Sequence, residues 1–131
     1  MNFESTYVDP RGRTSRGQFI GGVIPLVAAV VLYVVLVGGV TGGWCLMALL
    51  FPALVLHARR LHDMSRTGWL VLVPGVLNAA AIWLHYITRD GGQLKDSVTL
   101  AALAVSAAFV LWGLLRKGKA KANRFGEPAA A

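Results

Sequence analysis

Apolar residues occur along this chain in long runs, and short polar or glycine-rich segments separate them. From Gly17 to Ala58 there is no Asp, Glu, Lys or Arg. A helix needs about 20 apolar residues to cross a bilayer, so this stretch is long enough for two crossings. Two more apolar runs follow, and the pattern predicts an all-α membrane protein with a bundle of four transmembrane helices. The predicted helices are 17–37, 44–61, 68–88 and 97–115.

Glycine, proline and capping residues predict where these helices end. Segment 38–43 is Gly-Gly-Val-Thr-Gly-Gly, which predicts a turn because glycine tolerates positive φ. Segment 89–92, Arg-Asp-Gly-Gly, predicts a second turn, with Asp96 or Ser97 as the N-cap of the fourth helix. Pro52 predicts an interruption of the second helix.

The basic residues predict how the chain is oriented. Eleven of the thirteen Lys and Arg lie in segment 1–16, at 59–66 around the connection between helices two and three, or in segment 116–131. By the positive-inside rule, both termini then face the cytoplasm. The chain is thus predicted to be a single membrane domain with a cytoplasmic N-terminal segment, 1–16, and a basic cytoplasmic tail, 116–131. The tail has no apolar periodicity, so we expect it to be mobile and attracted to anionic lipid.

Composition limits the classes of protein to which the chain can belong. Apolar residues make up 56% of the chain and charged residues 15%, against about 25% charged in ordinary soluble domains. The net charge is +7, but the cations flank apolar runs and do not alternate with aromatic side chains, which argues against nucleic-acid binding. The single cysteine, Cys45, has no partner for an internal disulfide. The first 16 residues are polar, so no cleavable signal peptide is expected.

The charged cluster His-Ala-Arg-Arg-Leu-His-Asp-Met-Ser-Arg-Thr-Gly-Trp at 57–69 is the main candidate site. Arg59 and Asp63 lie four residues apart, as do His62 and Arg66, so each pair shares a face if the helix continues. Arginine presents a planar fork of donors that matches phosphate oxygens. The cluster therefore predicts a site for anionic lipid or lipid phosphate. The alternative interpretation is a topology signal with a local salt bridge.

Metal, cofactor and catalytic sites are less well supported by the sequence. His57 and His62 are five residues apart, on different faces of a helix, and the His-Glu-x-x-His spacing is absent. His62 with Asp63 is the only compact acid–base pair on the cytoplasmic side. Neither Ser15 nor Ser65 lies in a glycine-framed nucleophile elbow. We expect no metal and no cofactor, and a binding protein rather than an enzyme.

Polar and small residues within the predicted spans indicate helix packing. Asn78, Thr99 and Ser106 are the polar exceptions, and hydrogen bonding between helices is a better explanation for them than a substrate pathway. Small residues four apart predict close helix contacts at three places: Gly17/Gly21, Gly75/Ala79 and Ala102/Ser106.

Three segments together resemble a known family. Residues 59–63, Arg-Arg-Leu-His-Asp, followed by 66–69, Arg-Thr-Gly-Trp, resemble the signature of small bacterial inner-membrane proteins called domain of unknown function 805. The segment Gly-Arg-x-Ser-Arg-x-x-Phe at 12–19 is similar to the part of that family before its first span. Asn-Arg-Phe-Gly-Glu-Pro at 123–128 is similar to its closing segment. Ile20, Thr67 and Phe125 depart from the usual Trp, Ser and Tyr.

The resemblance implies a helical protein of the bacterial inner membrane without an established activity. It also implies that the three segments, all predicted on the cytoplasmic side, are used together. The predicted site for anionic lipid consists of Arg13, Arg16, Arg59, Arg60, His62, Asp63, Arg66 and Trp69.

Three hypotheses follow. In the first, this site binds membrane lipids and the protein is a stress or envelope component, acting through a membrane-protein partner or as a homo-oligomer. In the second, the cluster only braces the turn between helices two and three, and both terminal segments dock onto it. In the third, the protein is a lipid-modifying enzyme or a small transporter.

Overall fold

The chain folds into helices, as the apolar pattern predicts. The structure is a computed structural model that describes residues 2–41, 43–88 and 91–129, and these residues form no β-strand. In chain order the elements are α1 (Phe3–Tyr7), α2 (Arg16–Tyr33), a π-helical turn (Val34–Gly38), α3 (Gly39–Thr41), α4 (Leu46–Asp63), the 3₁₀ turn η2 (Gly68–Val71), α5 (Leu72–Ile87) and α6 (Gln93–Leu115).

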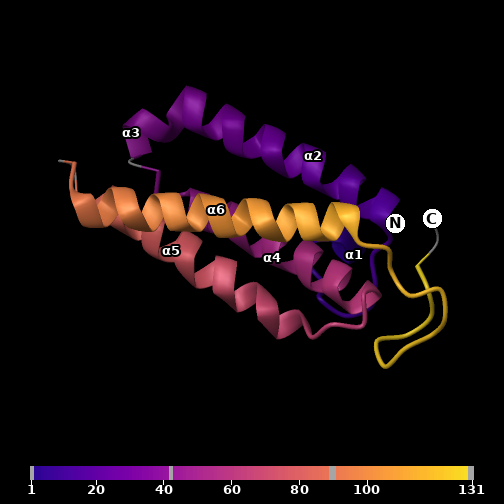
Figure 1. Cartoon of the computed structure of the whole chain (residues 1–131). Helices are drawn as coiled ribbons and strands as arrows, with labels where there is room; N and C mark the ends of the chain where they lie inside the picture. The colour runs from indigo at the N-terminus through magenta and orange to yellow at the C-terminus, as the bar shows by residue number, and fades with distance from the viewer. Residues whose placement is uncertain (1, 42, 89–90, 130–131) are drawn as a thin grey trace.

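Four long helices, α2, α4, α5 and α6, run side by side, and both termini lie at the same end (Figure 1). We call this end, formed by residues 2–15, 64–67 and 116–129, the terminal end. The opposite end, which carries α3 and the α5–α6 connection, is the turn end. Helix α5 packs along α6, whereas α2 contacts mainly α4.

The glycine turn predicted at 38–43 is wrong over most of its length. Helix continues from α2 through the π-helical turn and α3 as far as Thr41, and residue 42 lies outside the described residues. An uninterrupted helix satisfies its own backbone hydrogen bonds, which matters where no water replaces them. Thr41 also bonds within this helix, to the Val37 carbonyl at 3.3 Å and to the Tyr33 hydroxyl.

Other predicted boundaries also move. Helix α4 passes through Pro52 without a break and extends to Asp63. Helix α6 begins at Gln93 with Gly92 as its N-cap, so Asp96 lies within its first turn and is not the cap. A carboxylate there still interacts favourably with the positive end of the helix dipole. Residues 89–90 of the predicted second turn lie outside the described residues.

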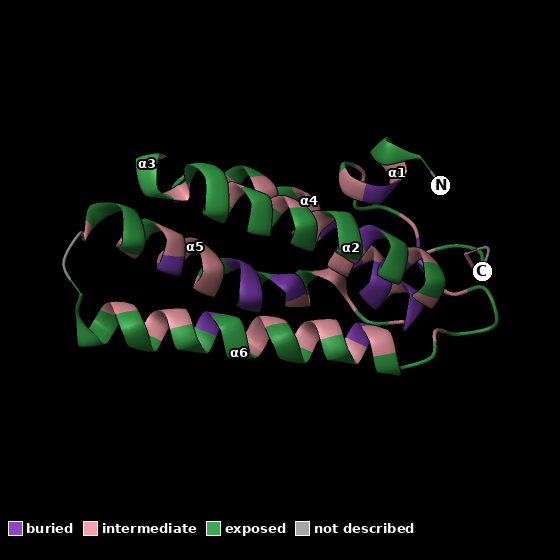
Figure 2. Cartoon of the chain, turned by 90° about the horizontal axis from the view of Figure 1, so that it is seen from above, coloured by how far each residue is buried: buried purple, intermediate pink, exposed green. Residues whose placement is uncertain are grey.

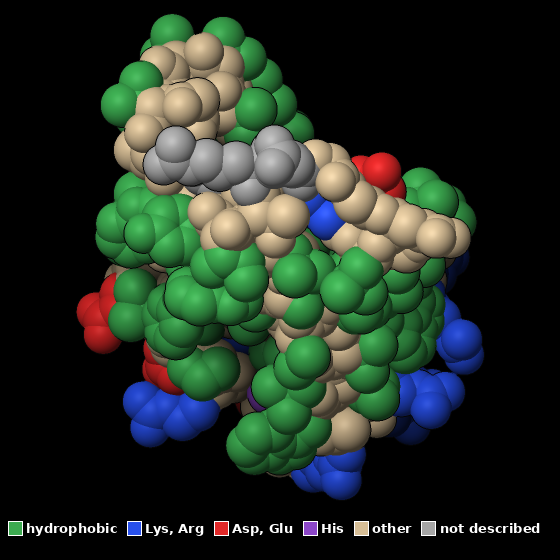
Figure 3. Space-filling view, turned by 90° about the vertical axis from the view of Figure 1, so that its left-hand side faces the viewer, with side chains coloured by type: hydrophobic (Ala, Val, Ile, Leu, Met, Phe, Trp, Pro, Cys, Tyr) green, Lys and Arg blue, Asp and Glu red, His purple; other side chains and the backbone are tan. Residues whose placement is uncertain are grey.

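Burial is concentrated at the terminal end (Figure 2). Phe19 of α2 and Leu56 and Leu61 of α4, in the helical turns next to this end, are at most 2% exposed. Elsewhere the long helices present apolar side chains outward, including Val35 at 73% and Leu100 at 69% exposure. The turn end, viewed directly, is dominated by apolar side chains, and Lys and Arg are visible mainly at its margins (Figure 3).

Three helical stretches among the described residues are long and apolar enough to cross a membrane: Arg16–Thr41, Gly68–Ile87 and Gln93–Leu115. Helix α4 is 18 residues long but carries Arg59, Arg60 and Asp63 in its last turns. An apolar outer surface of this size is unfavourable in water and favourable in lipid. The fold is therefore that of an integral membrane protein.

Small residues make only some of the predicted helix contacts. A Cβ added at Gly75 would lie 3.2 Å from a Leu54 methyl group, and Ala102 is 2% exposed, so both positions are in close contact. The predicted contact at Gly17 and Gly21 is wrong, because an added Cβ there meets nothing within 4 Å. Residues on the lipid-facing side of a helix do not need to be small.

Neighbouring glycines in α2 provide a matched test of this packing. A Cβ at Gly22 would lie 2.9 Å from both methyl groups of Leu56, which is fully buried. We expect Gly22→Ala to lower the free energy of unfolding by about 1–3 kcal/mol through overpacking. Gly21→Ala should be neutral or slightly stabilising, because alanine favours helix. Thermal unfolding in mild detergent checks this, and equal midpoints for the two variants would contradict it.

Candidate functional site

The site is built around Asp63, the last residue of α4. Its side chain is 8% exposed, and both carboxylate oxygens are occupied. Arg13 donates from Nε to Oδ1 at 3.0 Å, and its Nη2 lies 2.9 Å from the same oxygen. Arg60 donates to Oδ2 from Nη1 at 2.6 Å. Removing charges from water is costly, so a buried carboxylate is stable only when such donors surround it.

Arg60 joins α4 to the end of α6. Its side chain is 1% exposed. It donates to the carbonyl of Gly113 from Nε at 2.8 Å and to that of Arg116 from Nη2 at 2.5 Å. The last carbonyls of a helix have no partner within the helix, and a guanidinium satisfies them and favours the negative end of the dipole. Arg60 therefore caps α6 while it neutralises Asp63.

Arg13 joins the N-terminal segment to the tail. From Nη2 it donates to the Lys119 carbonyl at 2.5 Å, and from Nη1 to those of Lys121 at 3.0 Å and Gly126 at 3.2 Å. The Lys119 N–H also donates to the carbonyl of Asp63 at 2.8 Å. The expectation of a mobile tail is therefore wrong for this part of the chain, because its backbone oxygens solvate a buried cation.

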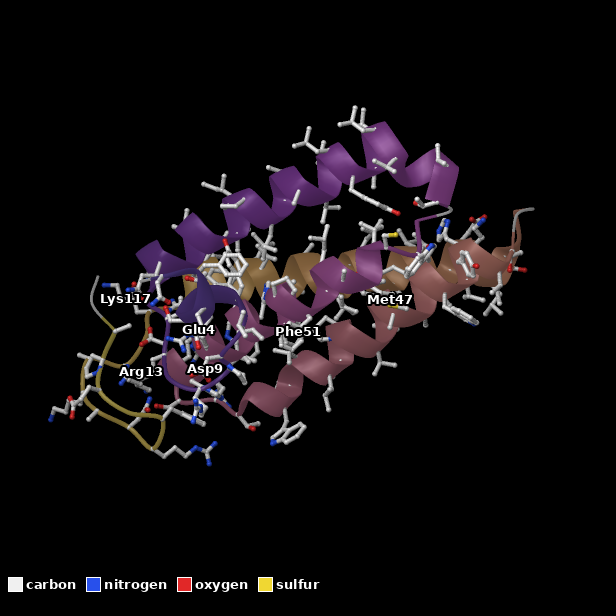
Figure 4. All side chains as sticks on the ribbon, turned by 180° about the vertical axis from the view of Figure 1, so that it is seen from behind. Glu4, Asp9, Arg13, Met47, Phe51 and Lys117 are labelled. Carbon is white, nitrogen blue, oxygen red and sulfur yellow. The ribbon has the colours of Figure 1, made fainter. Side chains whose placement is uncertain are left out.

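Gly118 allows the tail to approach the carboxylate. A Cβ built there would lie 2.6 Å from Cγ of Asp63 and would overlap its carboxylate. Only glycine fits against Asp63 in this position. The tail and the N-terminal segment lie together beside the end of α4, and Arg13 lies between that end and the tail (Figure 4).

Arg59 holds the N-terminal segment and does not pair with Asp63. It donates to Thr14 Oγ1 at 3.1 Å and to the carbonyls of Asp9, Arg11 and Arg13. The predicted Arg59–Asp63 pair is therefore wrong. Arg59 and Asp63 are four residues apart in α4, but the carboxylate of Asp63 binds Arg60 and Arg13 instead. Arg13 is distant from Asp63 in sequence.

His62 anchors the closing segment. Its Nδ1 lies 2.9 Å from the Gly12 carbonyl, and its ring stacks on Phe125 with centroids 3.9 Å apart. The Asn123 amide donates to the His62 carbonyl at 3.0 Å. Burial lowers the pKa of His62, and the charges of nearby arginines lower it further while the Gly12 carbonyl opposes the shift. The neutral ring, with a proton on Nδ1, fits this environment.

The remaining predicted site residues lie at the edge of the cluster. Arg16 is half-buried at the start of α2. Arg66 is exposed. The predicted shared face of His62 and Arg66 does not form, because α4 ends at Asp63 and Ser65 has a φ of 57°. Trp69 is 77% exposed. The structure thus joins Arg13, Arg59, Arg60, His62 and Asp63, and leaves Arg66 and Trp69 at the surface.

Sequence reasoning missed most of the partners that complete the cluster. Thr14, Gly118 and the carbonyls of Gly113, Arg116, Lys119, Lys121 and Gly126 carry no side-chain signal of a charged site. Gly12, Asn123, Phe125 and Gly126 lay within motifs already singled out, but their contacts with the cluster could not be read from the motifs. In the described part of the chain no three His, Cys, Asp or Glu residues gather as metal ligands would.

The arrangement is suited to fixing structure. The guanidinium groups of Arg13, Arg59 and Arg60 are directed at protein oxygens, and each carboxylate oxygen of Asp63 accepts from an arginine. Both described terminal segments and the end of α6 converge on the end of α4. We call this set, Arg13, Thr14, Arg59, Arg60, His62 and Asp63, the Arg–Asp cluster.

Comparison with known proteins identifies a family. Residues 7–127, nearly the whole chain, match the family model described as Protein of unknown function (DUF805). This range contains two of the three segments on which the sequence resemblance rested, and the third except for its last residue, Pro128. No curated protein and no solved structure matches the chain.

Breaking the buried ion pair tests the structural role of Asp63. In Asp63→Asn, one arginine faces an amide N–H₂ group and both arginines lose their buried counter-charge. We expect the free energy of unfolding to fall by about 3–5 kcal/mol, as for other broken buried pairs. Asp9→Asn is the matched control, because the Asp9–Arg11 pair is solvent-exposed and such pairs contribute little. A thermal melt of Asp63→Asn that equals that of wild type would refute the structural role.

Docking of the tail has its own test. Gly118→Ala should displace residues 118–126 from Asp63, so trypsin should cleave after Lys119, Lys121 and Arg124 faster than in wild type. Ala122→Ser adds one atom to the same segment at an exposed position and should leave the cleavage rate unchanged. Equal cleavage rates for the two variants would show that the tail is not held at Gly118.

Proposed function

The chain belongs to the DUF805 family, and within it we propose a bacterial inner-membrane protein whose Arg–Asp cluster is a structural brace. In this proposal the brace fixes both terminal segments as a basic cytoplasmic cap, which binds the headgroups of anionic lipids. One observation carries the structural part: both oxygens of the Asp63 carboxylate are taken by Arg13 and Arg60, at a side chain that is 8% exposed.

The proposed topology has four crossings and cytoplasmic termini. Both termini lie at one end of the molecule (Figure 1), as an even number of crossings requires. Helix α4 runs beside the three more apolar stretches, and in a bundle its charged last turns would lie at the membrane boundary. Eight of the thirteen Lys and Arg belong to the segments of the terminal end, and three more, Arg16, Arg59 and Arg60, lie in the adjoining turns of α2 and α4. This distribution supports a cytoplasmic position for that end.

Headgroup binding is assigned to the exposed cations. Arg59 and Arg60, the first choice from sequence, are occupied by protein oxygens. Seven other basic side chains of the terminal end are exposed: Arg11, Arg66, Arg116, Lys117, Lys119, Lys121 and Arg124. Each cation near an anionic membrane surface contributes about 1 kcal/mol. Docking of the tail holds four of these groups, those of residues 117–124, close to the bundle.

Two sets of variants separate the brace from the lipid-binding surface. The first is Asp63→Asn. The second replaces by Gln four basic residues whose side chains take no part in the brace: Lys117, Lys119, Lys121 and Arg124. Native mass spectrometry in mild detergent, with dioleoyl phosphatidylglycerol competing against dioleoyl phosphatidylcholine, measures lipid preference. We expect the tail variant to lose most of its preference for the anionic lipid and to keep the wild-type melting temperature.

For Asp63→Asn we expect the opposite combination, a lower melting temperature with the lipid preference retained. A tail variant that keeps the full preference would contradict headgroup binding by the cap. A change of lipid preference in Asp63→Asn at temperatures where it is fully folded would contradict the separation of the two roles.

A further inference from the structure

A groove lies beside the Arg–Asp cluster on the outer side of α4. Its volume is about 440 Å³, which is within the usual range for small-ligand sites. Apolar side chains of α4, among them Phe51, Val55 and Ala58, form one wall, and Leu72 of α5 contributes to the other. The groove shares one residue, His62, with the Arg–Asp cluster.

The polar groups of the groove are gathered at one end. Arg11, His62 and Thr67 line it at the terminal end, whereas Phe51 lies farther along α4 toward the turn end. From His62 to Phe51 the helical rise is about 16 Å, at 1.5 Å per residue. The groove is therefore elongated along the bundle, with a polar mouth and an apolar interior.

The groove opens to the surroundings of the bundle and not into its core. Phe51 is 56% exposed, Leu72 49% and Trp69 77%, and all three line it. In the proposed membrane orientation, this side faces lipid, and an indole is favoured at the headgroup level. The medium that reaches the groove from this side is the hydrocarbon of the cytoplasmic leaflet.

Arg11 places an exposed guanidinium group at the mouth, where it pairs with Asp9. Its side chain is 89% exposed, and Asp9 holds Nε and Nη2 at 3.0 and 3.2 Å. Among the described residues, Nη1 of Arg11 has no protein acceptor. A guanidinium oriented in this way still has donors for a phosphate oxygen.

We infer that this groove binds one phospholipid, with an acyl chain along α4 and an anionic headgroup at Arg11. The inference rests on the proposed lipid-binding function and assigns it a defined site outside the brace. An elongated apolar interior fits a hydrocarbon chain, and the cationic mouth fits phosphate. The site requires the docked tail, because Phe125 also lines it.

Filling the groove tests the position of the chain. Leu72→Trp places a large side chain in the groove from its exposed wall. Leu111→Trp on α6 is the matched control, because Leu111 is 54% exposed and does not line the groove. In native mass spectrometry with dioleoyl phosphatidylglycerol, wild type and Leu111→Trp should retain one lipid at detergent concentrations that strip the others, and Leu72→Trp should not.

Removing the charge tests the headgroup. Arg11→Gln should lower the ratio of retained phosphatidylglycerol to phosphatidylcholine about fivefold, the equivalent of about 1 kcal/mol for one basic residue. Arg116→Gln removes an exposed cation away from the groove and should leave that ratio for the single retained lipid unchanged. Melting temperatures within the wild-type range confirm that each variant is folded.

The outcomes distinguish the groove from the broader proposal. Equal lipid retention by Leu72→Trp and Leu111→Trp overturns the groove, even if the cap still prefers anionic lipid. A retained lipid that Leu72→Trp removes, but that shows no headgroup preference in wild type, overturns the anionic headgroup at Arg11 and keeps the chain site. The proposed function is overturned separately, by a tail variant that keeps its full preference for anionic lipid. A second protein copy displaced by Leu72→Trp, with no lipid retained, overturns the inference.

Discussion

The cost of burying a carboxylate organises the terminal end of this protein. Asp63 has little access to water, so its charge must be compensated by groups that the fold brings to it. Arg13 and Arg60 provide the charge, but each arginine carries more donors than Asp63 can accept. The surplus donors are satisfied by carbonyls of α6, the N-terminal segment and the tail. One buried charge thereby fixes the positions of three segments that are far apart in sequence.

The helical membrane fold could be predicted because it depends on a property that is additive along the chain. Runs of apolar residues identify membrane-crossing helices whatever their neighbours are, and the family assignment is confirmed. The residues at which the helices begin and end were less predictable. Gly38 and Gly39 indicate a turn in water, yet helix continues through them to Thr41, because a helix satisfies its own backbone hydrogen bonds where no water replaces them.

The cluster could be located from sequence, but its connections could not. Local spacing favoured Arg59 as the partner of Asp63, while the structure uses Arg60 and Arg13. Arg13 lies 50 residues before Asp63, and no periodicity within one helix reveals such a partner. Most of the other acceptors are backbone carbonyls, which every residue possesses, so the sequence gives no mark of the role of Lys119 or Gly126. Gly118 was visible as a glycine but not as the point of contact.

The docked tail also orders events during synthesis. Arg13 and Asp63 emerge from the ribosome well before the carbonyls of residues 119–126 that complete the hydrogen bonding of Arg13. Until that segment has been translated, the membrane helices can assemble while the buried charges at their end remain hydrated. Residues 119–126 therefore close the terminal end only after the four long helices have been translated.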